Sequence, residues 1–385
     1  MSVLGSSTLF TADEKNIEAM LATQFNDFGL GPDRRGSFRP LLGNGIFTED
    51  GEQWIHSRSL LRPQFARDQV SDLDREEGHV QNMMLALPTD ASKWTTEVDL
   101  SALFFRLTLD SACEFLFGES VDSQLAGLST QSRPNSPFGN DSGFGCAFDK
   151  GQADVAIRLR FRSKGWLVYP PGFRKACQQC HDFIDHFVAI ALSKDLERGL
   201  EGSEKKRKYV FLEALATQTQ DPLELRSQLL NILLAGRDTT ASLLGWMFYS
   251  LARDHTRYAK LRAIVLSEFG PYSSNPFETV TFSKLKSCRY LQHCLNESLR
   301  LHPAVPLNAR QANKDTTLPR GGGPDGQNPI FVPAGTVVDY SVYVLHHRRD
   351  IWGEDADEFK PERWEGRKSG WEYLPVSKVQ LFPNI

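Results

Sequence analysis

The sequence predicts one mainly α domain with a small β portion. Most of its 385 residues fall into segments in which apolar side chains recur at helical spacing. Strand patterns gather late in the chain, at 329–332 and 336–340. With 40% hydrophobic and 24% charged residues, the composition is that of a folded globular protein.

The apolar spacing predicts helices over 16–28, 64–87, 100–117, 173–198, 212–218, 221–254, 257–269 and 283–301. The two late strands are joined by Pro-Ala-Gly at 333–335, which suits a tight turn, so we expect them to pair as a hairpin after a flexible run at 321–328. The polar, turn-rich stretch at 129–142 is expected to be a long exposed loop.

The helix expected over 221–254 has the best-defined start. Asp221 can cap it, Pro222 fits the first helical position, and Glu224 stands where a capping box places its acid. Apolar residues lie nearly all round this helix, so it should cross the core.

The middle of this helix reads Ala-Gly-Arg-Asp-Thr-Thr over 235–240. Gly236 lets another group approach the backbone closely, and Thr239 and Thr240 can hydrogen-bond to the preceding turn. The hexapeptide predicts either a polar notch in an apolar wall or an ordinary kink with solvent-facing charges.

Charge and cysteine content exclude several classes of protein. A net charge of −4 gives no reason to expect a nucleic acid partner, and the basic run at 205–208 is interpreted as a solvated loop. Six cysteines are too few for a disulfide-rich secreted scaffold. The first ten residues lack the charged and apolar segments of a signal peptide. No apolar stretch is as long as a membrane span, so a cytosolic or peripheral location is expected for the chain as written.

A second motif pairs Glu297 with Arg300, three residues apart on one face of a predicted helix. Arg363, in the sequence Pro-Glu-Arg-Trp, offers a second guanidinium to the same carboxylate.

Taken in order, AGRDTT, ESLR and PERW resemble the oxygen-activation helix, the Glu-x-x-Arg motif and the Pro-Glu-Arg-Trp motif of cytochromes P450. Trp54 and Arg58 resemble the family's Trp-x-x-x-Arg helix, whose side chains meet a haem propionate. Arg310 occupies a place where the family often has another propionate-binding arginine, and a guanidinium suits a carboxylate because it donates two parallel hydrogen bonds.

The sequence from LLGNGIFTEDGEQW to FKPERWEGRKSGWEYLP particularly resembles the fungal cytochromes P450 that hydroxylate n-alkanes and fatty acids. This resemblance implies a P450 fold with haem, in which Asp238 and Thr239 are catalytic and relay protons to dioxygen. It implies that Ala235 and Gly236 lie against the haem and that Glu297, Arg300 and Arg363 hold the core beneath it. Residues expected near a long-chain aliphatic substrate are Ile46, Phe47, Leu234, Ala235 and Val305.

The same resemblance implies a haem-thiolate monooxygenase that uses O2 and takes electrons from NADPH through NADPH–cytochrome P450 reductase. Full-length relatives are expected on the endoplasmic reticulum membrane. We expect the P450 domain to occupy 1–375, incomplete at both ends, and 376–385 to be a tail foreign to the family. The family's cysteine loop, which supplies the axial haem ligand, has no counterpart here, so we assign no metal ligand and expect weak haem retention.

Two other readings stay open. Cys177-Gln-Gln-Cys180-His181 matches the signature of covalent c-type haem attachment, or half of a zinc site, although it lies in an amphipathic helical segment where structural thiols are expected. The chain is alternatively an inactive, haem-free P450 fragment that acts as a binding decoy or has no function. His346 is interpreted as a surface or sheet-end residue.

Overall fold

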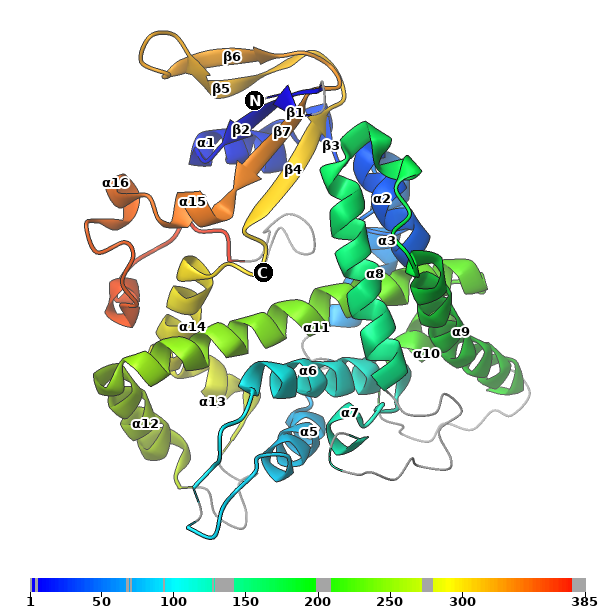
Figure 1. Ribbon diagram of the computed structural model, residues 1–385, viewed down its shortest axis with the longest axis vertical. Helices are drawn as coiled ribbons and strands as arrows, with labels where there is room; N and C mark the ends of the chain where they lie inside the picture. The colour runs from blue at the N-terminus through cyan, green and yellow to red at the C-terminus, as the bar shows by residue number, and fades with distance from the viewer. Residues whose placement is uncertain are drawn as a thin grey trace. The chain divides into compact units, whose positions relative to one another are not determined.

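The computed structural model describes residues 2–3, 6–66, 69, 71–92, 94–126, 128, 142–198, 209–271 and 280–375. The chain divides into two compact units, a sheet unit of Met1–Gly29 with Ser242–Ile385 and a helical unit of Leu30–Ala241. Helix α11, Pro222–Arg253, contributes residues to both units. The predicted class, mainly α with a small β portion, is confirmed (Figure 1).

The sheet unit holds a five-stranded sheet with strand order β1-β2-β7-β4-β3 and a separate pair, β5-β6. Strand β2 runs parallel to β7, and the other neighbouring strands are antiparallel. The strands are β1 Ser2–Val3, β2 Ser6–Thr11, β3 Phe28–Gly29, β4 Leu307–Ala312, β5 Thr316–Gly322, β6 Asn328–Val332 and β7 Val337–Ser341. Segments from the two ends of the sequence therefore lie side by side in one sheet (Figure 1).

The hairpin predicted for 329–332 and 336–340 is wrong. Strand β6 pairs with β5, whereas β7 pairs with β4 and β2, so the turn at 333–335 carries the chain from one sheet to the other. The run expected to be flexible at 321–328 contains the turn between β5 and β6, where Gly321 N–H donates to the Gly326 carbonyl at 2.8 Å. Alternation identifies strands but not their partners, and β5 was missed because its sequence, TTLPRGG, resembles a loop.

The helices of the sheet unit pack on the sheet or beside α14. They are α1 Glu14–Glu18, which continues as a π turn over Ala19–Thr23, then α12 His255–Phe269, α13 Phe282–Ser287, α14 Arg289–Leu301, α15 Val342–His346 and α16 Arg349–Trp352, with a 3-10 turn at Pro361–Trp364. The helix predicted over 283–301 is interrupted at Cys288, whose ψ of 88° is not helical. The core against the sheet is formed by Ile17, Met20, Leu21, Phe28, Val338, Tyr340 and Leu345.

The helical unit is built from longer helices around an aromatic core. They are α2 Pro32–Leu42, α3 Gly51–Leu61, α5 Leu73–Leu85, α6 Leu100–Phe117, α7 Ser123–Ala126, α8 Ser142–Arg160, α9 Phe173–Arg198, α10 Phe211–Ala216 and the first part of α11. In the core, the Phe183 ring stacks on Phe144 at 4.0 Å between centroids, and the Phe117 ring stacks on Phe187 at 4.6 Å. The predicted helices over 100–117 and 173–198 are confirmed, whereas α2 and α8 were missed.

Three sequence expectations fall on other parts of the chain. These are the loop expected at 129–142, of which only Ser142 at the start of α8 is described, the basic run at 205–208 and the tail at 376–385; the rest of all three lies outside the described residues. Within the described residues, no helix has the combination of length and apolar character that crossing a membrane requires.

Candidate functional site

In the helical unit, α11 carries the predicted Ala-Gly-Arg-Asp-Thr-Thr segment as uninterrupted α-helix. Thr239 Oγ1 donates to the Ala235 carbonyl at 2.7 Å, so this threonine bonds to the preceding turn without breaking the helix. Gly236 is exposed, and a Cβ placed there would have no atom within 4 Å. The face of α11 at Gly236 is therefore bare, as close approach of a flat ligand to the backbone requires.

The two charges in this segment do not simply face solvent. The Arg237 side chain is buried, pairs with the Asp149 carboxylate and lies 3.2 Å from Asp238 Oδ1. Its guanidinium also sits 5.3 Å from the centre of the Phe105 ring. Burial raises the pKa of the Asp238 carboxyl, and the nearby Arg237 charge offsets part of this rise. An acid with a raised pKa exchanges protons more readily near neutral pH.

The start of α11 differs in part from the prediction. Asp221 Oδ1 accepts from the Leu223 N–H at 2.9 Å, as a cap should. The Glu224 carboxylate does not bond back to the cap; it accepts from the Thr219 hydroxyl and pairs with His56 at 2.6 Å. The capping box is therefore a wrong prediction, because a histidine on α3 and a nearby hydroxyl compete for the same carboxylate.

Trp54 and Arg58 lie one turn apart on α3. The Arg58 guanidinium is 5.3 Å from the centre of the Trp54 ring, a cation–π contact. Burial and the positive charge of Arg62 lower the pKa of Arg58. Because both effects disfavour its charge, an added anion here would be stabilising, which fits a carboxylate ligand such as a haem propionate.

In the sheet unit, Glu297 and Arg300 on α14 form a fully buried ion pair. Each side chain is 0% exposed, and Arg300 Nε and Nη2 donate to the two Glu297 oxygens at 2.8 Å each. Arg300 also donates to the carbonyls of His346 and Ala356 at 2.8 and 2.7 Å. The pair thus ties α14 to two later segments of the chain.

The Pro-Glu-Arg-Trp turn, Pro361–Trp364, donates hydrogen bonds to the same Glu297 carboxylate. Arg363 Nε donates to Glu297 Oε1 at 3.2 Å, Trp364 Nε1 donates to Oε2 at 3.0 Å, and the Lys360 backbone N–H donates to Oε1 at 3.0 Å. Glu297, Arg300 and Arg363, which we selected from sequence, therefore lie together. Trp364 and Lys360, which also donate to this carboxylate, were not predicted as part of the network. The tryptophan of the Pro-Glu-Arg-Trp motif was the one signal in the sequence that could have indicated Trp364.

His346 is another residue that sequence reasoning missed. The interpretation as a surface residue is wrong, since its side chain is 0% exposed. Its Nδ1 lies 3.1 Å from the Arg300 carbonyl, and its Nε2 accepts from the Leu374 N–H at 2.9 Å. A carbonyl only accepts and an N–H only donates, so these two partners select the neutral tautomer with its proton on Nδ1. Burial lowers the pKa of His346 to about 3, which agrees with a neutral ring.

Arg310 lies on β4 and is buried, with 4% of its surface exposed. Its Nη1 donates to the Ala309 carbonyl at 2.8 Å, and within the described residues no carboxylate lies in ion-pair range of it. A buried guanidinium without a carboxylate suits an anionic ligand.

The described cysteines do not fit covalent haem attachment. Cys177 and Cys180 are buried on α9, where burial raises their thiol pKa values to about 11 and about 12. His181 is occupied by the Leu41 carbonyl at 2.9 Å. Burial likewise raises the pKa of Cys294 to about 12, so it is a poor thiolate ligand. No cluster of three metal-binding side chains occurs among the residues that the structure describes.

Comparison with known proteins supports one family. A cytochrome P450 family model matches residues 3–378. The chain is 58% identical over 380 residues to cytochrome P450 monooxygenase g430 of a Fusarium species, covering 97% of this chain and 66% of the relative. It is 46% identical to cytochrome P450 monooxygenase alt2 of Alternaria solani and 48% identical to cytochrome P450 52A3-A of Candida maltosa, covering 72% and 70% of those relatives.

The chain thus spans about two thirds of the length of these curated relatives. Its mainly helical fold, the buried Glu297 network and the match over nearly all of its residues agree with one another. The chain belongs to the cytochrome P450 family of monooxygenases.

Proposed function

We propose that this chain is the haem-binding part of a monooxygenase that hydroxylates long-chain aliphatic substrates, namely n-alkanes and fatty acids. The observation that carries the proposal is the α11 segment, where the bare backbone at Gly236 is followed, two and three residues later, by a half-buried carboxyl of raised pKa and a hydroxyl. The substrate class rests on the resemblance to fungal alkane and fatty-acid hydroxylases.

Residues in each unit suit the haem. In the helical unit, Trp54 and Arg58 would hold a propionate, while Ala235 and Gly236 would present the flat face of α11 to the ring. In the sheet unit, Arg310 would hold a propionate. When bound, haem supplies the redox centre at which dioxygen is activated. No residue is assigned as its axial ligand.

Asp238 and Thr239 move protons in this proposal. The Asp238 carboxyl can hold a proton near neutral pH because its pKa is raised, and Arg237 keeps it oriented. The Thr239 hydroxyl, held by the Ala235 carbonyl, has its lone pairs available to accept a proton and pass it on.

The substrate chain is proposed to contact apolar residues placed by family position. Ile46 is buried and Phe47 is half-buried in a loop whose Phe47 N–H donates to Asn231 Oδ1 on α11 at 3.1 Å. A Cβ at Gly45 would lie 2.6 Å from the Asn231 amide nitrogen, so only glycine allows this close approach. Leu234, Ala235 and Val305 complete the proposed set.

Electrons would come from NADPH through NADPH–cytochrome P450 reductase, and the whole protein would act at the endoplasmic reticulum membrane, as the family resemblance implies. Neither the charge of the chain nor its motifs point to a nucleic acid partner.

The test is product formation by this chain joined to the carboxy-terminal segment of a fungal relative, which supplies the family's cysteine loop, expressed with a haem precursor and supplied with reductase, NADPH and lauric acid or hexadecane. The reduced carbon-monoxide spectrum reports thiolate-ligated haem, and mass spectrometry reports hydroxylated product. Thr239→Ala should lower product per NADPH by about a hundredfold or more, the scale of one lost proton-transfer group. Thr217→Ala, which removes an exposed hydroxyl that also donates to a carbonyl of the preceding turn, that of Ala214, should have no effect. A chain that shows neither the spectral band nor product contradicts the proposal.

A further inference from the structure

Two polar side chains of α8 reach the part of α11 that carries Asp238 (Figure 1). They belong to Asp149 and Gln152, which lie three residues apart and therefore on one face of α8. Asp149 pairs with Arg237, the residue before Asp238, and the Gln152 side chain hydrogen-bonds to the Asp238 carboxyl itself. The carboxyl that moves protons in the proposed function is therefore contacted from a second helix of the helical unit.

The Arg237 guanidinium is shared between two carboxylates. Its Nη1 donates to Asp149 Oδ1 and, at 3.2 Å, to Asp238 Oδ1, while its Nη2 donates to Asp149 Oδ2 at 3.3 Å. An Nη group carries two hydrogens, so Nη1 can serve both carboxylates at once. Asp149 thus receives two parallel hydrogen bonds and Asp238 receives one, which makes the pairing with Asp149 the stronger of the two.

The surroundings of Arg237 hold its guanidinium between these two partners. Its side chain is 4% exposed, and the guanidinium lies 5.3 Å from the centre of the Phe105 ring and 5.9 Å from that of Phe148. A buried guanidinium needs a counter-charge, and Asp149 and Asp238 are its ion-pair partners among the described residues. The two carboxylates therefore compete for one positive charge.

Two thiols also face this guanidinium, those of Cys113 on α6 and Cys180 on α9. Burial raises the pKa of the Cys180 thiol to about 12, so it is neutral near pH 7 and does not compete for the charge of Arg237.

The two contacts from α8 change the pKa of Asp238 in opposite directions. Burial has the largest effect and raises this pKa, and the Arg237 charge lowers it. The Gln152 hydrogen bond also lowers it, because an amide that donates to a carboxyl favours the charged form. The negative charge of Asp149 raises it, because a nearby like charge favours the protonated form.

We propose that Asp149 and Gln152 are positioning residues for Asp238, Asp149 through the guanidinium that both carboxylates share and Gln152 through its direct hydrogen bond. Asp149 favours the protonated form of Asp238 and Gln152 favours the charged form, so α8 balances the carboxyl between holding a proton and releasing it. The inference rests on the proposed function for the catalytic role of Asp238, whereas the coupling of α8 to this carboxyl is a property of the chain alone.

The experiment measures the pKa of Asp238 in the full 385-residue chain by carboxyl carbon NMR titration, with the signal assigned by its loss in Asp238→Asn. Asp149→Asn removes the competing charge at nearly constant shape and should lower this pKa, and Asp149→Glu should restore it. Gln152→Met keeps the length of the side chain but removes its donor, so it should raise the pKa. Asp182→Asn, which removes an exposed carboxylate from α9, is the matched control and should leave the pKa unchanged.

The opposite signs separate positioning from a purely structural role. A variant that merely loosened α8 would let water reach Asp238 and would lower its pKa in Asp149→Asn and in Gln152→Met alike. A lower pKa in Asp149→Asn together with a higher pKa in Gln152→Met supports the inference, and any other pattern overturns it.

The proposed function is judged separately, by product formation in the chain joined to the relative's carboxy-terminal segment. There the pH optimum should move to lower pH in Asp149→Asn and to higher pH in Gln152→Met. If the NMR shifts appear but the wild type forms no product, the proposed function fails while the coupling of α8 to Asp238 stands. If product forms and the NMR shifts are absent, the inference fails and the proposed function stands.

Discussion

Replacing Glu297 with glutamine tests the buried network at its centre. The carboxylate accepts five hydrogen bonds, two from Arg300 and one each from Arg363, Trp364 and the Lys360 backbone. If the amide oxygen of glutamine takes the Oε1 position, its NH2 group faces the Arg300 and Trp364 donors, so two bonds become donor–donor contacts. The Arg300 guanidinium, 0% exposed, also loses its counter-charge.

Breaking a buried pair from one side costs about 3–5 kcal/mol, which corresponds to a melting temperature lower by roughly 6–20 °C for a unit of this size. The assay is thermal and urea unfolding followed by tryptophan fluorescence, because Trp352 and Trp364 lie in the network and report on it directly. Glu354→Gln is the matched control, since Glu354 pairs with Arg349 at the surface and is 91% exposed; it should show no measurable change. A loss below about 1 kcal/mol for Glu297→Gln would refute the view that this ion pair holds the unit together.

Three further predictions concern pH, packing and charge. Burial lowers the folded pKa of His346 to about 3, below its unfolded value of about 6.5, so the stability it contributes is fully present above pH 6.5 and falls by up to about 1.4 kcal/mol per pH unit as the pH drops toward 3; urea midpoints should show a shallower slope for His346→Phe than for the wild type. Gly165→Ala should cost about 1–3 kcal/mol because its Cβ would lie 2.5 Å from a backbone carbonyl, whereas Gly36→Ala, in open space within a helix, should gain about 0.5–1 kcal/mol in thermal melts. Arg237→Gln should raise the pKa of the neighbouring carboxyl on α11 further, as carboxyl carbon NMR titration would show, and an unchanged pKa would contradict the assigned pairing.

Much of the helical architecture could be predicted from the sequence because long amphipathic segments carry many agreeing positions. Helices α6 and α9 have the predicted bounds. Strand pairing could not be predicted, because β2 joins β7 across more than three hundred residues and no local pattern encodes that contact. Helix α2 was missed for a local reason, since its sequence contains Gly36 and Pro40, both of which oppose helix formation.

Some of the site residues could likewise be predicted from the sequence, and others could not. Glu297, Arg300 and Arg363 could be grouped in advance, because Glu297 and Arg300 lie three residues apart on one predicted helix and Arg363 belongs to a second motif of the same family. Asp149 and Gln152 have no such signal in the sequence, since they lie on α8, a helix that was not predicted. Only their contacts with α11 distinguish them.

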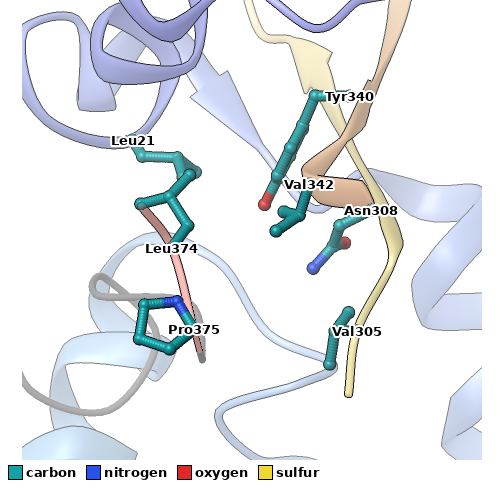
Figure 2. A pocket seen from close by; sticks show the side chains of 7 residues that line it. All are labelled: Leu21, Val305, Asn308, Tyr340, Val342, Leu374 and Pro375. Atoms are coloured by element: carbon teal, nitrogen blue, oxygen red, sulfur yellow. The ribbon is translucent and has the colours of Figure 1, made fainter. Parts of the chain in front are cut away.

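His346 shows how the buried network extends toward the small pocket that Tyr340, Val342 and Leu374 help to line (Figure 2). Its protonated Nδ1 is held by the Arg300 carbonyl, and its Nε2 holds the Leu374 N–H, so one neutral ring links the end of α14 to the segment that lines the pocket. The Tyr373 hydroxyl strengthens this link by donating to the Asn296 carbonyl at 3.1 Å. Because Leu374 is held from α14 while Tyr340 is held by the sheet, the pocket between them has two walls fixed by separate hydrogen-bond systems.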